Sequence, residues 1–314
     1  MACKDSAPVD EHWGLIIEEK EGYKVVDCLC CGFVHIDPIP GDRDMERIYV
    51  DEYFSKEKPE FIESVLEDLE WWDINYDERL GFMESRLGKH RRRVLDIGCG
   101  PGFFLKRAAG RGWQCLGVEP SKLAAEYAAG LGLNVKNDFF EGNTLKKEGH
   151  AFDAVHISEV LEHVADPLHL LKEAHGLLGE GGIICAVAPN DYSPVQKVLR
   201  DSLGFNPYWL SVPHHINYFS FDSMKALIRK AGFTIAEVSA TFPMDFFLLM
   251  GRNYVGDDKL GRSCHKMRKN LDTMLSTPEL KTFKKEMYAL MARHNIGRET
   301  IIYGVKGERW PEQL

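Results

Sequence analysis

The sequence lacks the features of a membrane protein, a secreted protein or a general nucleic-acid binder. No apolar stretch approaches the length of a bilayer span, and residues 1–13 contain no apolar signal core. A net positive charge is missing, since the formal net charge is −9 at pH 7. Binding to nucleic-acid phosphates needs a basic face. Internal repeats and low-complexity segments are also missing. These absences predict a globular cytoplasmic protein.

The regular cysteine spacing of a disulfide-stapled fold is also missing. The eight cysteines are unevenly spread, and Cys99, Cys115 and Cys185 fall in segments expected to form the core. A chain of 314 residues can bury a core that needs no disulfides. The pattern therefore favours free thiols in a reducing compartment.

Cys28 and Cys31 have the spacing of half a zinc knuckle, but the second cysteine pair that would complete it is absent. A structural zinc site needs four ligands. The residues that could substitute are Cys3, His12 and Cys30. We assign no metal to the chain and interpret residues 1–55 as a small hairpin region, with a degenerate zinc knuckle as the alternative.

Aromatic residues at 49, 53 and 54 follow this hairpin, where they either cap an active site or pack on the next domain. Residues 56–90 then show the apolar spacing of amphipathic helices. The expected role of these helices is to cover one face of a sheet. We expect two of them, one with Phe61, Val65, Leu69 and Trp72 on its apolar face and a second with Leu80, Met83 and Leu87.

The central motif of the chain is a strand that runs into a glycine-rich turn. Residues 94–97 form an apolar strand pattern, Gly98, Gly100 and Gly102 follow at alternate positions, and a helical pattern begins at Phe103. Glycines let the backbone approach a ligand closely, and a helix N-terminus offers free N–H groups. The motif predicts a binding site for a nucleotide-like ligand.

The turn differs from two familiar nucleotide motifs. The dinucleotide fingerprint needs a third glycine where this chain has Phe103, and no Gly-Lys-Ser/Thr follows for a P-loop. What remains is the pattern D-x-G-x-G-x-G, from Asp96 to Gly102.

Two further loops are expected at the same sheet edge. Glu119 ends a second strand about 20 residues after the glycines, where a carboxylate can accept hydrogen bonds from ribose hydroxyls. The alternative is an acid at the start of a helix capped by Ser121. Asp138 and Phe139 follow a third strand, 133–136, and could contact an adenine amino group and ring. Their alternative roles are a loop acid and a core aromatic.

Apolar strands and helices alternate through the rest of the chain. This alternation predicts a doubly wound α/β sheet of seven strands, covered on both faces. The nucleotide-binding domain would comprise residues 91–242 and 297–308, and residues 243–296 would be a helical insertion. The insertion is either a packed hairpin, a homodimer contact or a lid over the acceptor.

In order and spacing, these motifs resemble class I S-adenosylmethionine-dependent methyltransferases over residues 90–240. The resemblance rests on the glycine turn, Glu119-Pro120, residues 160–164 and residues 178–182. It is closest to the ubiquinone-biosynthesis-like branch, which includes methyltransferases of sugars and natural products. The Cys28–Gly32 turn also resembles the N-terminal zinc module of some sugar methyltransferases.

The resemblance implies S-adenosylmethionine as cofactor, an antiparallel last strand and a set of contacts. Glu119 would bind the ribose, and Ser158 and Glu159 would lie beside the sulfonium. The full set of implied cofactor residues is Asp96, Gly98, Cys99, Gly100, Gly102, Phe103, Glu119, Pro120, Asp138, Phe139, Ser158 and Glu159. Glu162 and His163 have either a structural or a direct role.

Two adjacent histidines, His214 and His215, lie after the fifth strand in a segment expected to be irregular, 189–213 and beyond. Methyl transfer requires the protein to align the acceptor and to take its proton, which suits histidine. In related sugar methyltransferases an acid and then a histidine occupy the matching positions, so His215 is the expected base. The alternative is a histidine that is hydrogen-bonded into its loop.

The expected function is methyl transfer to a small-molecule acceptor, with a hydroxyl of a sugar or natural product as first choice. Methylation of nitrogen or carbon in a nucleotide-linked sugar is one alternative. A non-catalytic partner protein that binds S-adenosylmethionine is another.

Overall fold

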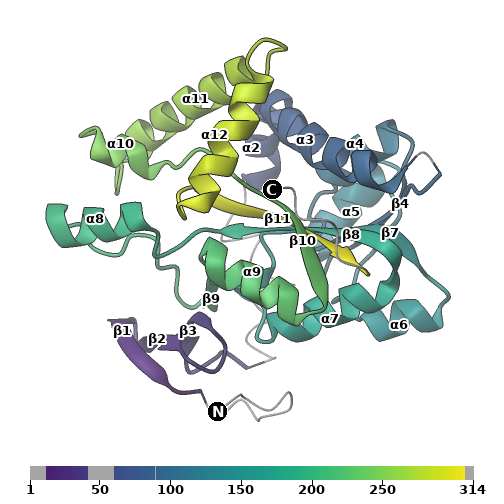
Figure 1. Ribbon diagram of the computed structural model, residues 1–314, viewed down its shortest axis with the longest axis horizontal. Helices are drawn as coiled ribbons and strands as arrows, with labels where there is room; N and C mark the ends of the chain where they lie inside the picture. Colours follow the sequence, from purple (N-terminus) through teal and green to yellow (C-terminus); the bar gives the residue numbers. More distant parts are fainter. Residues whose placement is uncertain (1–11, 42–59, 89, 308–314) are drawn as a thin grey trace.

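The computed structural model describes residues 12–41, 60–88 and 90–307, and it contains a large and a small β-sheet (Figure 1). The large sheet has seven strands and helices on both faces, which confirms the predicted doubly wound α/β fold. In spatial order its strands are β10 (Phe233–Ala240), β11 (Glu299–Lys306), β8 (Leu178–Pro189), β7 (Phe152–Ser158), β4 (Arg93–Ile97), β5 (Gln114–Val118) and β6 (Val135–Lys136). The predicted third strand, 133–136, is thus only two residues long.

The order of the strands places a ligand site at the end of β4. Strands β4 to β8 pair in parallel, with β5 on one side of β4 and β7 on the other. The chain therefore reverses its direction of winding at β4, and ligands of such sheets bind at that point, outside the carboxyl ends of the strands. Strand β11 runs antiparallel to both β8 and β10, as the resemblance implied.

Alternate side chains of β4 enter two separate apolar cores. Leu95 and Ile97 pack with helices on one face, while Val94 packs with Leu80 and Phe104 on the other. Asp96 therefore faces the second layer, which contains α3 (Leu69–Leu87) and α4 (Phe103–Gly110).

The other helices of the described residues are α2 (Phe61–Glu67), α5 (Lys122–Gly130), α6 (Gly142–Lys147), α7 (Pro167–Leu177), α8 (Pro194–Leu203), α9 (Phe221–Lys230), α10 (Asp245–Leu249), α11 (Asp258–Leu275) and α12 (Lys281–Arg293).

Two sequence expectations about helices are wrong. The two cover helices divide at Asp68, so Leu69 and Trp72 belong to α3 and not to the first helix. The segment expected to be irregular contains α8, which begins with a capping box between Ser193 and Gln196 and with Pro194 in its first turn. That Ser-Pro-x-Gln pattern is a helix-start signal. No helix within the described ranges is both long enough and apolar enough to span a bilayer.

The small sheet joins the N-terminal region to the loop that contains the two histidines. Its strands are β1 (Gly14–Lys20), β2 (Tyr23–Cys28), β3 (Phe33–Asp37) and β9 (Asn217–Tyr218). Strands β2 and β3 form the predicted hairpin, and β1 and β9 are additions that the sequence did not reveal. The Ile36 N–H also donates to the Ile216 carbonyl at 2.9 Å. The aromatic residues at 49, 53 and 54 lie outside the described residues.

The late insertion packs on the cover helix α3. The Trp71 Nε1–H of α3 donates to the Asp272 carboxylate of α11 at 3.0 Å. The Arg268 guanidinium lies over the Trp71 ring, 4.8 Å from its centroid. Helix α12 lies against β10, with Tyr288 and Ala292 in a small core beside Ala240. The insertion thus extends the helical layer on that side of the sheet.

Gly102 offers a test of how closely the glycine turn packs against helix α5 and Leu133. Its φ is +81°, and an added Cβ would lie 2.6 Å from the Leu133 Cδ1 and 3.0 Å from the Ala128 Cβ. We expect Gly102→Ala to lower the free energy of unfolding by about 1–3 kcal/mol, since both the left-handed backbone and the close contacts oppose a side chain. Urea denaturation of both proteins measures this difference.

The matched control is Gly110→Ala at the end of the same helix. Gly110 has no atom within 4 Å of an added Cβ, so alanine there should be neutral or stabilising by up to about 1 kcal/mol. Equal stability of the two variants would contradict the packing role of Gly102.

Candidate active site

A cavity of about 930 Å³ opens at the carboxyl ends of β4, β5 and β7. Glycine-turn residues, the end of β5, the 158–165 segment and the cover helix α3 all contribute to its lining. Ten of the twelve cofactor residues implied by the resemblance form part of it, together with His215. They are Asp96, Gly98, Cys99, Gly100, Phe103, Glu119, Pro120, Phe139, Ser158 and Glu159.

The glycine turn combines a ligand surface with a packing surface. Gly98 has φ +68°, and a Cβ there would lie 2.4 Å from the Val160 Cγ2. Its N–H donates to the Val118 carbonyl at 2.8 Å. Gly102 packs against α5 and lies outside the lining formed by the described residues. Gly102 therefore shapes the helix start, which differs from the ligand contact that the resemblance implied.

Glu119 holds the turn in place. Its Oε2 accepts from the Gly100 N–H and its Oε1 accepts from the Ser121 N–H, both at 2.8 Å. The residue is only 5% exposed, and burial raises the pKa of Glu119 to about 7. Each oxygen keeps a second lone pair for a ligand hydroxyl. Ser121 occupies the expected N-cap position of α5, but its side chain makes no capping hydrogen bond.

Asp96 belongs to a buried chain of hydrogen bonds. The His156 Nδ1–H donates to the Asp96 Oδ1 at 2.7 Å, and the His156 Nε2 accepts from the Arg79 Nη1 at 3.2 Å. The same Arg79 nitrogen donates to the Ser158 Oγ at 3.2 Å. Burial lowers the pKa of His156, which keeps the ring neutral in this arrangement, and Phe104 stacks on it at 3.7 Å.

Asp138 and Phe139, the two residues expected to contact the adenine, differ in their position relative to the cavity. Phe139 is 43% exposed and lines the cavity. Asp138 lies outside the lining formed by the described residues, and its Oδ1 accepts from the Phe139 N–H at 2.8 Å. Asp138 therefore orders the loop that presents Phe139.

The adjacent histidines, His214 and His215, also differ in their position relative to the cavity. His215 lines the cavity, whereas His214 lies outside the lining that the described residues form. The His214 carbonyl accepts from the His163 Nδ1–H at 2.8 Å, and the Ile216 N–H donates to the Glu162 carbonyl at 2.7 Å. The loop is thereby fixed to the short 3₁₀ turn Leu161–His163.

Glu162 and His163 approach His215 from this turn. The rings of His163 and His215 are 4.9 Å apart, and one donor atom from each of the three residues lies within 4.8 Å of the others. Burial, together with the nearby Glu159 carboxylate, raises the pKa of Glu162 well above its ordinary value. The group is suited to passing a proton and offers three donors to a cation. Sequence analysis found no partner for the histidine pair.

Sequence analysis also missed the contribution of helix α3. Trp72 and Tyr76 line the cavity, and Arg79 reaches the His156–Ser158 chain from the same helix. Their spacing of i, i+4 and i+7 places them on one helix face. That polar and aromatic stripe was the signal available in the sequence.

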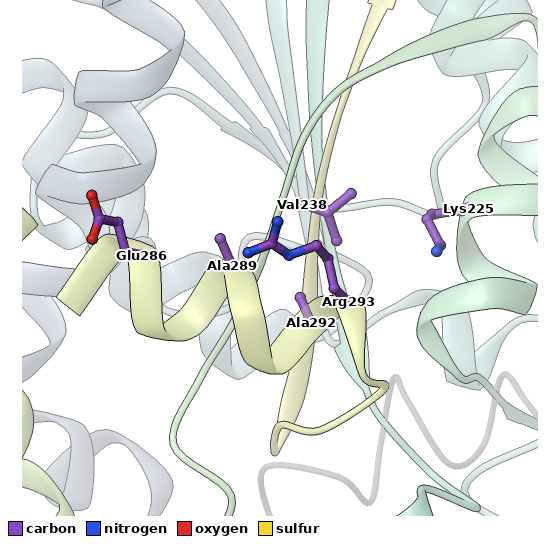
Figure 2. A pocket seen from close by; sticks show the side chains of 6 residues that line it. All are labelled: Lys225, Val238, Glu286, Ala289, Ala292 and Arg293. Carbon is purple, nitrogen blue, oxygen red and sulfur yellow. The ribbon is translucent and has the colours of Figure 1, made fainter. Parts of the chain in front are cut away.

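A second hollow, of about 350 Å³, lies between α12, Lys225 of α9 and Val238 of β10 (Figure 2). Helix α12 contributes Glu286, Ala289, Ala292 and Arg293 to it. None of the implied cofactor residues, and neither His214 nor His215, lines this hollow. The chemistry therefore concentrates at the larger cavity.

The buried chain at Asp96 yields a stability prediction. We expect His156→Phe to lower the free energy of unfolding by about 3 kcal/mol or more, because Asp96 and Arg79 each lose a hydrogen-bond partner while remaining buried. Denaturant unfolding of the ligand-free protein measures the loss. His169→Phe is the control, since His169 lies on the surface of α7, and it should change stability by less than about 0.5 kcal/mol. Similar free energies of unfolding for the two variants would contradict the proposed importance of these buried hydrogen bonds.

Comparison with known proteins agrees with this geometry. A family model described as a methyltransferase domain matches residues 75–238. The ubiquinone biosynthesis O-methyltransferase of Ruegeria pomeroyi is 30% identical over 192 residues, which cover 52% of this chain and 77% of the relative. The enzyme of that name from Coxiella burnetii is 32% identical over 108 residues, 33% of this chain and 46% of the relative.

A solved structure shares the fold. The plantazolicin methyltransferase BpumL, in complex with a monoazolic desmethylPZN analog and SAH, aligns with a TM-score of 0.51 at 13% identity. The alignment covers 85% of this chain and 97% of that chain.

The cavity itself fits S-adenosylmethionine. Gly98 leaves no room for a side chain, and the buried Glu119 carboxylate has lone pairs available beside it. The family match spans the glycine turn, Glu119 and the loop that contains His214 and His215. The chain therefore belongs to the methyltransferase-domain family and is a class I S-adenosylmethionine-dependent methyltransferase.

Proposed function

We propose that this enzyme methylates a hydroxyl group of a small molecule, such as a sugar or natural product, with His215 as the general base. The observation that carries the proposal is the position of His215, which lines the same cavity as the glycine turn and Glu119. The relatives support oxygen as the acceptor atom, since they are named O-methyltransferases.

Distinct residues are assigned to each part of the cofactor. Gly98 and Gly100 would face its methionine portion, Glu119 the ribose and Phe139 the adenine. Ser158 would lie near the reacting end, where Arg79 orients its hydroxyl at 3.2 Å. When bound, S-adenosylmethionine supplies a methyl group on a positively charged sulfur.

His215 has the surroundings that a base needs. The backbone N–H of His215 donates to the Ser211 carbonyl at 2.7 Å, which fixes the backbone position of the residue. The neighbouring loop residues are bonded to the 161–163 turn. The imidazole accepts the proton of the acceptor hydroxyl as the oxygen–methyl bond forms, and it then returns that proton to water. His163 and Glu162 lie beside it.

The cavity is large for a small-molecule pocket, and aromatic side chains contribute to its lining. Its volume of about 930 Å³ is at the upper end of the roughly 300–1,000 Å³ range of pockets for one drug-sized ligand. Trp72, Tyr76 and Phe61 from the cover helices line the cavity. They would exclude water from the reacting groups and pack on the acceptor.

Substitution of His215 tests the base assignment. We expect His215→Asn to lower kcat by roughly 10²–10⁴-fold, because the variant cannot take the proton. Binding of S-adenosylhomocysteine should be unchanged, since the glycine turn and Glu119 are intact. The assay measures S-adenosylhomocysteine release with a panel of sugars and phenols, with amines as a comparison set.

His214→Asn is the matched control, because it alters the same loop outside the cavity lining. Its kcat should fall by less than about tenfold. Full turnover by His215→Asn, or equal losses in the two variants, would contradict the assignment. Turnover with amines alone would replace the hydroxyl acceptor by nitrogen.

The buried carboxylate predicts a pH dependence of cofactor binding. A pKa of about 7 for Glu119 means that the acid form dominates below neutrality in the free protein. Only the ionised form accepts from two ribose hydroxyls, so affinity should rise as pH increases. We expect the dissociation constant for S-adenosylhomocysteine to fall roughly tenfold between pH 6 and pH 8.

Titration calorimetry in buffers of different ionisation enthalpy measures both the affinity and the proton released. Glu119→Gln is the control, because it keeps the shape of the side chain but does not titrate. Its affinity should be low and nearly constant over the same range. A wild-type affinity that does not change with pH would contradict the role of Glu119.

A further inference from the structure

Four potential metal ligands converge in the N-terminal sheet, far along the chain from the glycine turn. They are His12, Cys28, Cys31 and His35, and one ligand atom from each lies within 4.8 Å of the other three. The His12 Nδ1 is 3.6 Å from the Cys28 Sγ and 3.2 Å from the Cys31 Sγ. Cys28 and His35 are each only 1% exposed.

These separations match those around a tetrahedral zinc ion. Zinc–sulfur bonds of about 2.3 Å and zinc–nitrogen bonds of about 2.0–2.1 Å at a tetrahedral angle place the two donor atoms about 3.6 Å apart. Of the two observed nitrogen–sulfur distances, the one to Cys28, 3.6 Å, equals that value, and the one to Cys31, 3.2 Å, is slightly shorter. The four side chains therefore need little movement to bind an ion at their centre.

The orientation of the His35 ring points to a ligand. Its Nδ1–H donates to the Ile36 carbonyl at 2.8 Å, which fixes the tautomer and leaves the lone pair on Nε2. That Nε2 is buried and has no hydrogen-bond partner among the described residues. Such a nitrogen is costly to bury unless it binds something. A backbone carbonyl on the other ring nitrogen is the usual arrangement for a metal-bound histidine.

The backbone around Cys28 and Cys31 is arranged to stabilise the thiolate form of a cysteine side chain. The Gly32 N–H donates to the Cys28 carbonyl at 2.9 Å and closes a tight turn. The Cys31 N–H lies 3.4 Å from the Cys28 Sγ, where it can donate to a negatively charged sulfur. The Leu29 N–H donates to the Trp13 carbonyl at 3.1 Å, which holds His12 above the turn.

We propose that His12, Cys28, Cys31 and His35 bind one zinc ion as a structural site. Two thiolates and two imidazoles form a Cys₂His₂ set, and four protein ligands leave no open position for catalysis. The set differs from the sequence expectation, which assigned no metal and considered only His12 from this group as a substitute for the missing cysteine pair. His35 lies within a strand, so its role was visible only after β3 had been placed beside His12.

The site would brace the N-terminal sheet against the catalytic domain. His12 precedes β1, Cys28 ends β2 and His35 lies in β3, so one ion would join three strands. His35 also pairs with Asn217 of β9. Loss of the ion should therefore lower the thermal stability of the full chain, while the glycine turn continues to bind S-adenosylhomocysteine.

The test measures metal in the full-length protein purified without chelators. We expect about one zinc per chain by elemental analysis. Cobalt added to the stripped protein should give the intense visible bands of a tetrahedral site with two thiolates. His35→Phe and Cys31→Ser should each retain less than roughly a tenth of the wild-type zinc after dialysis. Wild-type protein should lose thermal stability on chelation.

Control variants distinguish this site from other metal-binding groups. Cys115→Ser and His294→Asn remove a thiol and an imidazole elsewhere and should keep the full zinc content. His163→Asn should also keep it, and zinc lost from that variant but kept by His35→Phe would move the ion to the active site and overturn the proposal. Wild-type protein that carries no zinc and gives no tetrahedral cobalt spectrum would overturn it as well. The wild-type measurements decide the question even if a variant fails to fold, and none of them depends on methyl transfer.

Discussion

The buried Glu119 carboxylate is the contact on which the cofactor end of the site depends. It binds the Gly100 N–H with one oxygen and the Ser121 N–H with the other, so it joins the loops after β4 and β5. The N–H groups of Gly98 and Cys99 donate to the Val118 carbonyl beside it. A glycine turn has little conformational preference of its own, and these four bonds select one conformation before any ligand arrives.

One short segment connects this end of the site to the acceptor end. Val160 occupies the space beside Gly98, and two residues later Glu162 binds the Ile216 N–H through its carbonyl. The Asn217 side chain donates to the carbonyls of Leu161 and Val164 at 2.9 and 2.7 Å. A shift of the 160–164 segment would therefore move the glycine turn and the His215 loop together. Precise alignment of donor and acceptor, which methyl transfer requires, follows from this shared support.

Local sequence patterns predicted the parts of the molecule that local physics determines. The apolar strands, the glycine turn and the carboxylate at the end of the second strand each have a signal within a few residues, and the structure contains them. The partners of those residues were not predicted, because Arg79 meets His156 across 77 positions of sequence and His163 meets the His214 carbonyl across 51. The role of His35 was hidden for the same reason. Alternation within a strand shows which face a side chain occupies, but not what approaches that face.

The pairing of β3 with β9 has a consequence for the synthesis of the chain. The N-terminal hairpin leaves the ribosome early, but the strand that covers its edge, Asn217–Tyr218, follows the glycine turn and five strands of the large sheet. Until then β3 presents unpaired backbone groups, which readily pair with other chains. Domains generally fold as units during translation, and this one can close its first sheet only after most of its second has been made. An ion bound early between β2 and β3 would hold the hairpin in register through that interval, and so protect the nascent enzyme from aggregation.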